Sequence, residues 1–142
     1  MINTIVTGVD DTKTAASAAR KAAELANTHN AELHVVSAYG NQEIRTLRAG
    51  GDVLEINKVD EATQVAERVA ASLSADFPDL TITSGAALGQ AGEALVATAS
   101  KLNADLIVVG NKRVQGITRV LGSVARSVAA NAHCDVYIAY TS

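Results

Sequence analysis

The chain has 142 residues, of which 48% are hydrophobic, with one proline and no tryptophan. This composition predicts a single α/β domain over residues 1–142 with a packed core, and it argues against a disordered chain. The formal net charge of -3 and the aromatic content of 3% argue against a nucleic-acid-binding protein. Phosphate backbones select a basic surface, and single strands need aromatic rings for stacking.

Cysteine content and the N-terminal segment bear on the compartment. Cys134 is the single cysteine, so the chain cannot form an intrachain disulfide, which fits a reducing compartment. The first residues, MINTIVTGVDD, lack the basic and long apolar segments of a signal peptide. No window approaches the ~18 uninterrupted apolar residues of a membrane-spanning helix. We therefore expect a cytoplasmic protein without a membrane partner.

The first half of the chain predicts two strands, each followed by a helix. Residues 4–9 are mostly β-branched and predict a strand, and residues 14–28 place alanines at helical spacing. Residues 32–39 predict the second strand and residues 58–76 the second helix. The intervening YGNQEIRTLRAGGDVLEIN is expected to be an irregular loop, either a lid over a ligand or a disordered surface loop.

The second half continues the alternation of short apolar runs and helical segments. The expected elements are a strand at 80–84, a helix at 91–102, a strand at 105–109, a helix at 123–132 and a strand at 136–140. Such alternation predicts parallel strands joined by right-handed crossovers. We therefore expect an open, doubly wound, five-stranded α/β sheet with about four helices. The central strands, IVTGV and LIVVG, lack polar alternation, as expected when helices cover both faces.

Ligands of open α/β sheets bind outside the carboxyl ends of the strands, which the sequence places at Asp10, Ala38, Gly85 and Gly110. The sequence at these strand ends does not match three familiar types of binding site. The first strand is followed by GVDDTKTA and not by the G-x-G-x-x-G of a Rossmann domain, and no lysine near glycine has a P-loop context. A phospho-receiver domain needs an aspartate after the third strand and a lysine after the fifth, but those strands end TSGAA and AYTS.

The glycine-rich connection between the last two strands is the remaining candidate. Gly110, Gly116 and Gly122 recur every six residues, and Gly122-Ser123 directly precedes a predicted helix. Backbone N–H groups and the helix dipole at such a start favour a phosphate, and glycines allow the main chain to approach it. The alternative is a structural turn in which Lys112, Arg113 and Arg119 are simply solvated.

Several segments together resemble the universal stress protein family over nearly the whole chain. They are IVTGVDDT, HVVSAY, GAALGQAGEALVATASKLNADLIVVGN and RVLGSVARSVAANAHCDVYIAY. The resemblance implies an adenine nucleotide alpha hydrolase-like fold with strand order 3-2-1-4-5. Many members of that family bind ATP in a cleft at the strand ends, and some bind cyclic AMP. It also implies a homodimer joined through the last strand, which this architecture places at a sheet edge.

The resemblance also implies roles for single residues. Asp10 would hold the adenosine end of the nucleotide, and main-chain groups at Ala38 would meet adenine. The family's phosphate motif is G-2x-G-9x-G-[ST]. Its first glycine matches Gly110 and its last two positions match Gly122 and Ser123, while Asn111 and Val124 lie directly beside them.

One part of the phosphate motif differs from the family pattern. Arg113 stands at the second glycine, and eight residues separate it from Gly122 where the family has nine. Gly116 would take over part of the missing glycine's role, and the guanidinium of Arg113 or Arg119 would supply charge-assisted contacts to phosphate. The shortened loop also suits a cyclic nucleotide.

No catalytic constellation is evident in the sequence. His29, His34 and His133 have no carboxylate partners at metal-ligand spacing, and Cys134 is expected to be a small packed side chain. We therefore expect no enzyme, or at most slow, incidental ATP hydrolysis. The expected function is that of a stress-response or signalling module that binds ATP, with Mg²⁺. The alternatives are a dimeric interaction module that binds no nucleotide and a cyclic AMP binder.

Overall fold

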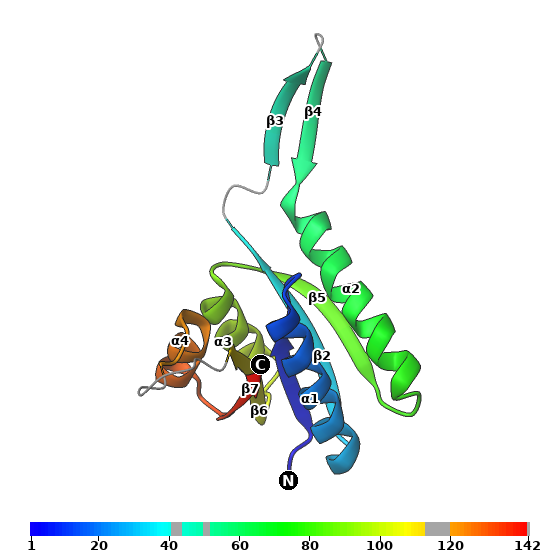
Figure 1. Cartoon of the computed structure of the whole chain (residues 1–142), viewed down its shortest axis with the longest axis vertical. Coiled ribbons are helices and arrows are strands. Elements are labelled where there is room, and N and C mark those ends of the chain that lie inside the picture. The colour runs from blue at the N-terminus through cyan, green and yellow to red at the C-terminus, as the bar shows by residue number, and fades with distance from the viewer. Residues whose placement is uncertain (41–43, 50–51, 113–119, 142) are drawn as a thin grey trace.

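The computed structural model describes residues 1–40, 44–49, 52–112 and 120–141. Seven strands and four helices lie within these residues (Figure 1). In chain order they are β1 (Thr4–Gly8), α1 (Lys13–His29), β2 (Glu32–Tyr39), β3 (Ile44–Ala49), β4 (Asp52–Asn57), α2 (Lys58–Asp76), β5 (Ile82–Leu88), α3 (Ala91–Lys101), β6 (Leu106–Lys112), α4 (Ser123–Asn131) and β7 (Asp135–Thr141).

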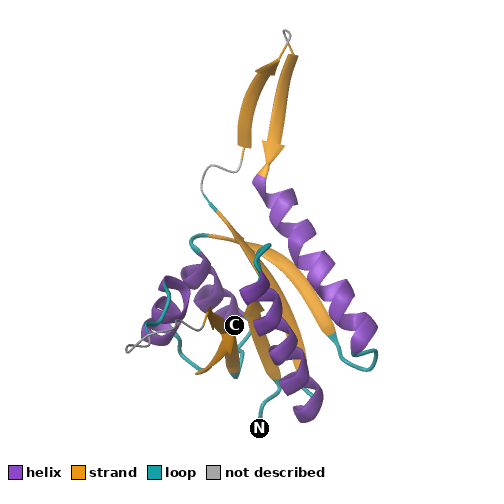
Figure 2. Cartoon of the chain, in the orientation of Figure 1, coloured by secondary structure: helices purple, strands orange, loops and turns teal. Residues whose placement is uncertain are grey.

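Five of these strands form one parallel sheet in the order β5-β2-β1-β6-β7. Since β3 and β4 lie outside it, this order is the expected 3-2-1-4-5, so the predicted fold is confirmed. β1 occupies the centre, and β7 is at one edge, as predicted. Ile5 and Val6 of β1 are both completely buried although they point to opposite faces. Helices therefore cover both sides of the central strand, which is why it lacks polar alternation (Figure 2).

The helices divide into two pairs, one on each face of the sheet. Helices α1 and α2 pack on the face that carries Ile5, Leu33 and Val108. Helices α3 and α4 pack on the other face, around Val6 and Ile107. The buried stripe of α1 consists entirely of alanines at helical spacing: Ala18, Ala19, Ala22, Ala23 and Ala26. Such small side chains allow the helix axis to approach the sheet closely.

Strands β3 and β4 correct one sequence-based prediction. The segment after β2 was expected to be irregular, but it contains an antiparallel hairpin in which Ile44 pairs with Asn57 and Ala49 with Asp52. The segment consists of two six-residue strands around a Gly-Gly pair, which is a typical hairpin pattern. In Figure 1 the hairpin extends away from the five-stranded sheet. The lid hypothesis for this segment is not tested.

Two strands of the main sheet are longer than the sequence indicated. β5 runs to Leu88, beyond the predicted end at residue 84, so Gly85 lies within a strand and not at its carboxyl end. The reason is pairing with β2, which continues from Val36–Gly85 to Tyr39–Leu88 and outweighs the weak strand propensity of glycine and alanine. β6 likewise extends past Gly110, because β7 pairs with it as far as Lys112.

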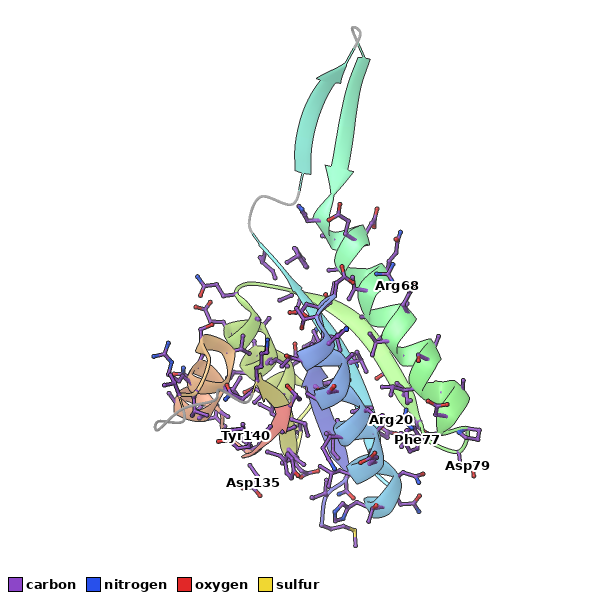
Figure 3. All side chains as sticks on the ribbon, in the orientation of Figure 1. Arg20, Arg68, Phe77, Asp79, Asp135 and Tyr140 are labelled. Atoms are coloured by element: carbon purple, nitrogen blue, oxygen red, sulfur yellow. The ribbon has the colours of Figure 1, made fainter. Side chains whose placement is uncertain are left out.

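Helices α1 and α2 are connected at the surface by one arginine. The Arg20 guanidinium donates to the Asp76 carboxylate at 2.8 Å and lies 5.5 Å from the centre of the Phe77 ring (Figure 3). Arg20 therefore pairs with the last residue of α2 and stacks on the residue that follows. The described helices include none that combines the length and the apolar composition needed to cross a bilayer.

Candidate functional site

A cavity of about 210 Å³ opens at the carboxyl ends of β1, β2 and β6. Helix α1 leaves β1 on one face of the sheet and α4 follows β6 on the other, so the cavity lies at the topological switch point where open α/β sheets bind ligands. Most of its lining residues are small or apolar. They are Gly8, Val9, Asp10, Thr12, Thr14, Ala15, Val36, Ala38, Ala91, Ala94, Leu95, Val109, Gly110 and Val124.

Asp10 is the one charged residue among those lining residues, and its carboxylate is oriented by the start of α1. Its Oδ1 atom accepts hydrogen bonds from the Thr12 backbone N–H, at 2.8 Å, and from the Thr12 hydroxyl. Thr12 in turn caps α1 by accepting from the Ala15 N–H at 3.2 Å. The neighbouring Asp11 instead forms an ion pair with Arg68 of α2 at 3.3 Å. Oδ2 of Asp10 is therefore the carboxylate oxygen left to accept from a ligand.

The starts of three helices converge on this cavity. Thr14 and Ala15 belong to the first turn of α1, Ala91 is the first residue of α3, and Val124 is the second residue of α4. The N-cap residues of α3 and α4 are Gln90 and Gly122, and neither makes a side-chain capping bond. Because a helix start carries unpaired N–H groups and partial positive charge, the cavity favours a negatively charged ligand.

Close packing at glycines brings these helix starts together. A Cβ atom on Gly110 would lie 2.9 Å from the Thr14 carbonyl oxygen, so glycine is needed where α1 passes over β6. A Cβ atom on Gly92 would lie 2.5 Å from Ser127 Oγ, so α3 and α4 also approach closely. Gly89, which precedes α3, has φ of 125°, a conformation that side chains rarely adopt, and its N–H donates to the Tyr39 carbonyl.

The structure separates the predicted site residues into three groups. Asp10, Ala38, Gly110 and Val124 line the cavity. Asn111, Gly122 and Ser123 lie beside it without lining it: Asn111 is 6% exposed, whereas Gly122 and Ser123 are exposed at the start of α4. Arg113 and Gly116 lie outside the described residues, so their proposed contacts are not tested.

Several lining residues were not singled out from the sequence. Thr12 could have been found, because a threonine before a helical segment is a standard capping signal and Asp10 lies two residues before it. Small and apolar residues such as Val36, Ala91 and Ala94 carry no comparable signal. Their sequence pattern is that of ordinary core positions, and only the fold places them on the wall of the cavity.

The described residues contain no cluster of three or more His, Cys, Asp or Glu side chains that could hold a metal ion. His34 lies within hydrogen-bonding distance of Thr83, 2.7 Å from Nδ1 to Oγ1, and burial lowers its pKa. Cys134 lies in a separate cavity, and burial together with the nearby Asp135 raises its pKa, which disfavours the nucleophilic thiolate. Neither residue lines the cleft.

The fold and the cleft define a doubly wound α/β protein with a cavity at the switch point of its sheet. Comparison with known families identifies the class more closely. The chain belongs to the universal stress protein family, which matches residues 1–139.

Solved structures agree with this assignment. A universal stress protein in complex with cAMP is 28% identical, with a TM-score of 0.71 and coverage of 99% of both chains. A protein of Mycobacterium tuberculosis H37Rv is 26% identical over 99% of this chain and 97% of its own, with a TM-score of 0.59. A universal stress protein of Archaeoglobus fulgidus in complex with dAMP is 22% identical over 97% and 98%, with a TM-score of 0.67.

Proposed function

We propose that this universal stress protein binds an adenine nucleotide in the cleft at β1, β2 and β6 and acts as a stress-response or signalling module. One observation carries the proposal: a single carboxylate, that of Asp10, faces a cavity on which three helix starts converge. A nucleotide combines the matching parts, because its ribose hydroxyls donate to a carboxylate and its phosphate accepts from helix N–H groups.

Each part of the nucleotide has a counterpart in the cleft. The ribose donates a hydroxyl to Oδ2 of Asp10, the atom not bonded to Thr12. Adenine lies against the apolar side chain of Val36 and the main chain at Ala38. The phosphate lies at the start of α4, beside Val124.

ATP is the ligand expected from the glycine motif, with Mg²⁺ as its cation. Since the described residues offer no cluster of ligating side chains, the cation would be held mainly by phosphate oxygens and water. Cyclic AMP is the second candidate, supported by the 28% identical relative solved with cAMP.

We expect the protein to bind its ligand with at most slow, incidental ATP hydrolysis, because the Thr12 hydroxyl that donates to Asp10 also caps α1. We further propose that two copies associate through β7, the edge strand whose other side pairs with β6. Tyr137 on this strand is 40% exposed and Tyr140 (Figure 3) is 39% exposed, and both offer aromatic contact area. The expected compartment remains the cytoplasm, since the chain has a single cysteine.

Calorimetric titration of the full chain with ATP, cyclic AMP, AMP and GTP tests the proposal. At least one adenine nucleotide should bind with Kd well below about 1 mM, where binding free energy is only about -4 kcal/mol, and GTP should bind more weakly. Asp10→Ala should reduce affinity about tenfold or more, because it removes a charge-assisted hydrogen bond.

Asp11→Ala is the matched control, because it removes the adjacent carboxylate, which pairs with Arg68 and does not line the cavity. Its affinity should equal that of the wild type. Failure of all adenine nucleotides to bind below about 1 mM would refute the proposal and favour the interaction module without a nucleotide. Sedimentation analysis of a Tyr137→Arg variant, which should be monomeric, tests the dimer separately.

A further inference from the structure

Asn111 joins the end of β6 to the start of α4 through both ends of its side-chain amide. Its Oδ1 atom accepts from the Gly122 backbone N–H at 2.7 Å. Its Nδ2 group donates to the Val120 carbonyl oxygen at 3.3 Å. The two bonds fix the orientation of the amide, since an N–H must meet the oxygen and a carbonyl must meet the NH₂ group. A single side chain thus holds both Val120 and Gly122 at fixed positions beside the sheet.

The amide of Asn111 is buried, whereas the two residues that it holds are exposed. Asn111 is 6% exposed, so its amide would be costly to bury without partners. Val120 is 59% exposed and Gly122 is also exposed, so burial of a side chain does not fix either residue. The two hydrogen bonds of the amide therefore help to determine where these residues lie.

Gly122 has the conformation of an ordinary residue, and the reason for a glycine there is contact with Asn111. Its φ of -66° and ψ of 170° are open to any amino acid. A Cβ atom at this position would lie 3.3 Å from Asn111 Oδ1, which is closer than most such contacts. The glycine thus permits the amide to approach the N-cap of α4, and the two residues act as a pair.

We propose that Asn111 is a positioning residue for the phosphate of the bound nucleotide. This inference rests on the proposed function, in which the N–H groups at the start of α4 receive the phosphate. Asn111 lies outside the cavity lining, and its amide is occupied by Val120 and Gly122. It acts through Gly122, the N-cap residue, whose carbonyl accepts the first helical hydrogen bond from Arg126 at 2.9 Å. Its two bonds hold the N-cap in place, and with it the N–H groups of the first turn that would receive the phosphate.

The test compares ligands with and without phosphate. Calorimetry on the full chain should show that Asn111→Ala lowers the affinity for AMP and cyclic AMP about tenfold, whereas the affinity for adenosine changes less than about twofold. The tenfold loss is the effect of one misplaced charge-assisted hydrogen bond. A purely structural role would lower all three affinities together, and that result would overturn the inference.

Two further variants separate positioning from lost stability. Thr7→Val removes another buried hydrogen bond of the sheet, from the Thr7 hydroxyl to the Val108 carbonyl, and should bind AMP and adenosine like the wild type. A phosphate-selective loss in this variant would count against a specific role for Asn111. Should Asn111→Ala not fold, Gly122→Ala replaces it: this exposed substitution crowds Asn111 Oδ1 and should show the same selective loss.

A ligand-free measurement distinguishes this inference from the proposed function. The Gly122 amide proton should exchange slowly with solvent in the wild type and at least about tenfold faster in Asn111→Ala, because its acceptor is lost. Wild-type protein that binds neither adenosine nor nucleotides would refute the proposed function and the phosphate role of Asn111 with it, and the exchange result would then show only whether Asn111 holds the Gly122 amide. Equal exchange rates in the two proteins would overturn the inference even if nucleotides bind.

Discussion

Replacing Gly110 by alanine should destabilise the protein through a contact with α1. The new Cβ atom would lie 2.9 Å from the Thr14 carbonyl oxygen, 3.0 Å from Thr14 Cγ2 and 3.1 Å from the Ala18 Cβ atom. The first of these atoms is backbone and belongs to the first turn of a 17-residue helix, so it cannot rotate away. Relief requires a shift of α1 relative to β6.

The size of the effect follows from two opposing terms. Overpacking of this kind costs about 1–3 kcal/mol, whereas replacing glycine by alanine stabilises by about 0.4–1 kcal/mol through the unfolded chain. The cost of the close contact exceeds the gain from the lower entropy of the unfolded chain, so we expect a net loss of about 1–2 kcal/mol of unfolding free energy. For a chain of this size the loss lowers Tm by roughly 3–8 °C. Because Thr14 lines the cleft, nucleotide affinity should fall as well.

Gly85→Ala provides the matched control for that measurement. A Cβ atom at Gly85 meets only His34, at 3.7 Å, an ordinary van der Waals distance. Urea unfolding should show Gly85→Ala to be as stable as the wild type or more stable by up to about 1 kcal/mol. If Gly110→Ala and Gly85→Ala proved equally stable, the packing of Thr14 against β6 would not be the reason for glycine at position 110.

Three further predictions concern side chains outside the cleft. Asp105 accepts backbone hydrogen bonds from Asn3 and Thr4, and these bonds lower its pKa. Its stabilising effect should therefore be present above about pH 4 and lost as the pH falls further. In urea unfolding, the free energy of unfolding of Asp105→Asn should approach that of the wild type only at low pH. Burial lowers the pKa of His34, so the wild type should lose stability as the pH falls below about 6.5, whereas His34→Gln should not show this loss. Identical pH profiles of unfolding free energy in the two proteins would contradict this prediction. Arg20→Lys should change Tm by no more than about 2 °C, because the ion pair with Asp76 is exposed, and a larger drop in a thermal melt would show that this reasoning is wrong.

The fold was predictable because the pattern of the sequence matches its packing over long segments. The segment 58–76 has helical periodicity and forms α2 with the predicted bounds, and the apolar run at β6 forms a strand covered on both faces. The hairpin β3–β4 was missed because its strands do not belong to the parallel sheet that the alternation of strands and helices predicts. The end of β5 was misplaced because pairing with β2, and not its own sequence, extends it.

The cleft was predictable only in part. Asp10, just after β1, and Ala38, near the end of β2, were found from the rule that ligands bind at strand ends. The same rule also gave Gly85, which lies within β5 and does not line the cavity. Gly110 was placed correctly for a different reason: the sequence suggested access for phosphate, and the structure shows a close contact with Thr14. The bonds of Asn111 were beyond sequence reasoning, because they join β6 to the start of α4 through a side chain that reaches nine to eleven residues along the chain.

The small residues on the wall of the cleft have a consequence for how the site changes during evolution. Ala38, Ala91, Ala94 and Gly110 line the cavity with side chains of at most one methyl group. Exchange of one such residue for another changes the space in the cavity little, so its shape is inherited with the path of the backbone more than with particular side chains. Added bulk would have the opposite effect. A leucine at Ala38 or Ala94 would project into the cavity of about 210 Å³ and reduce the space for the nucleotide proposed to bind there.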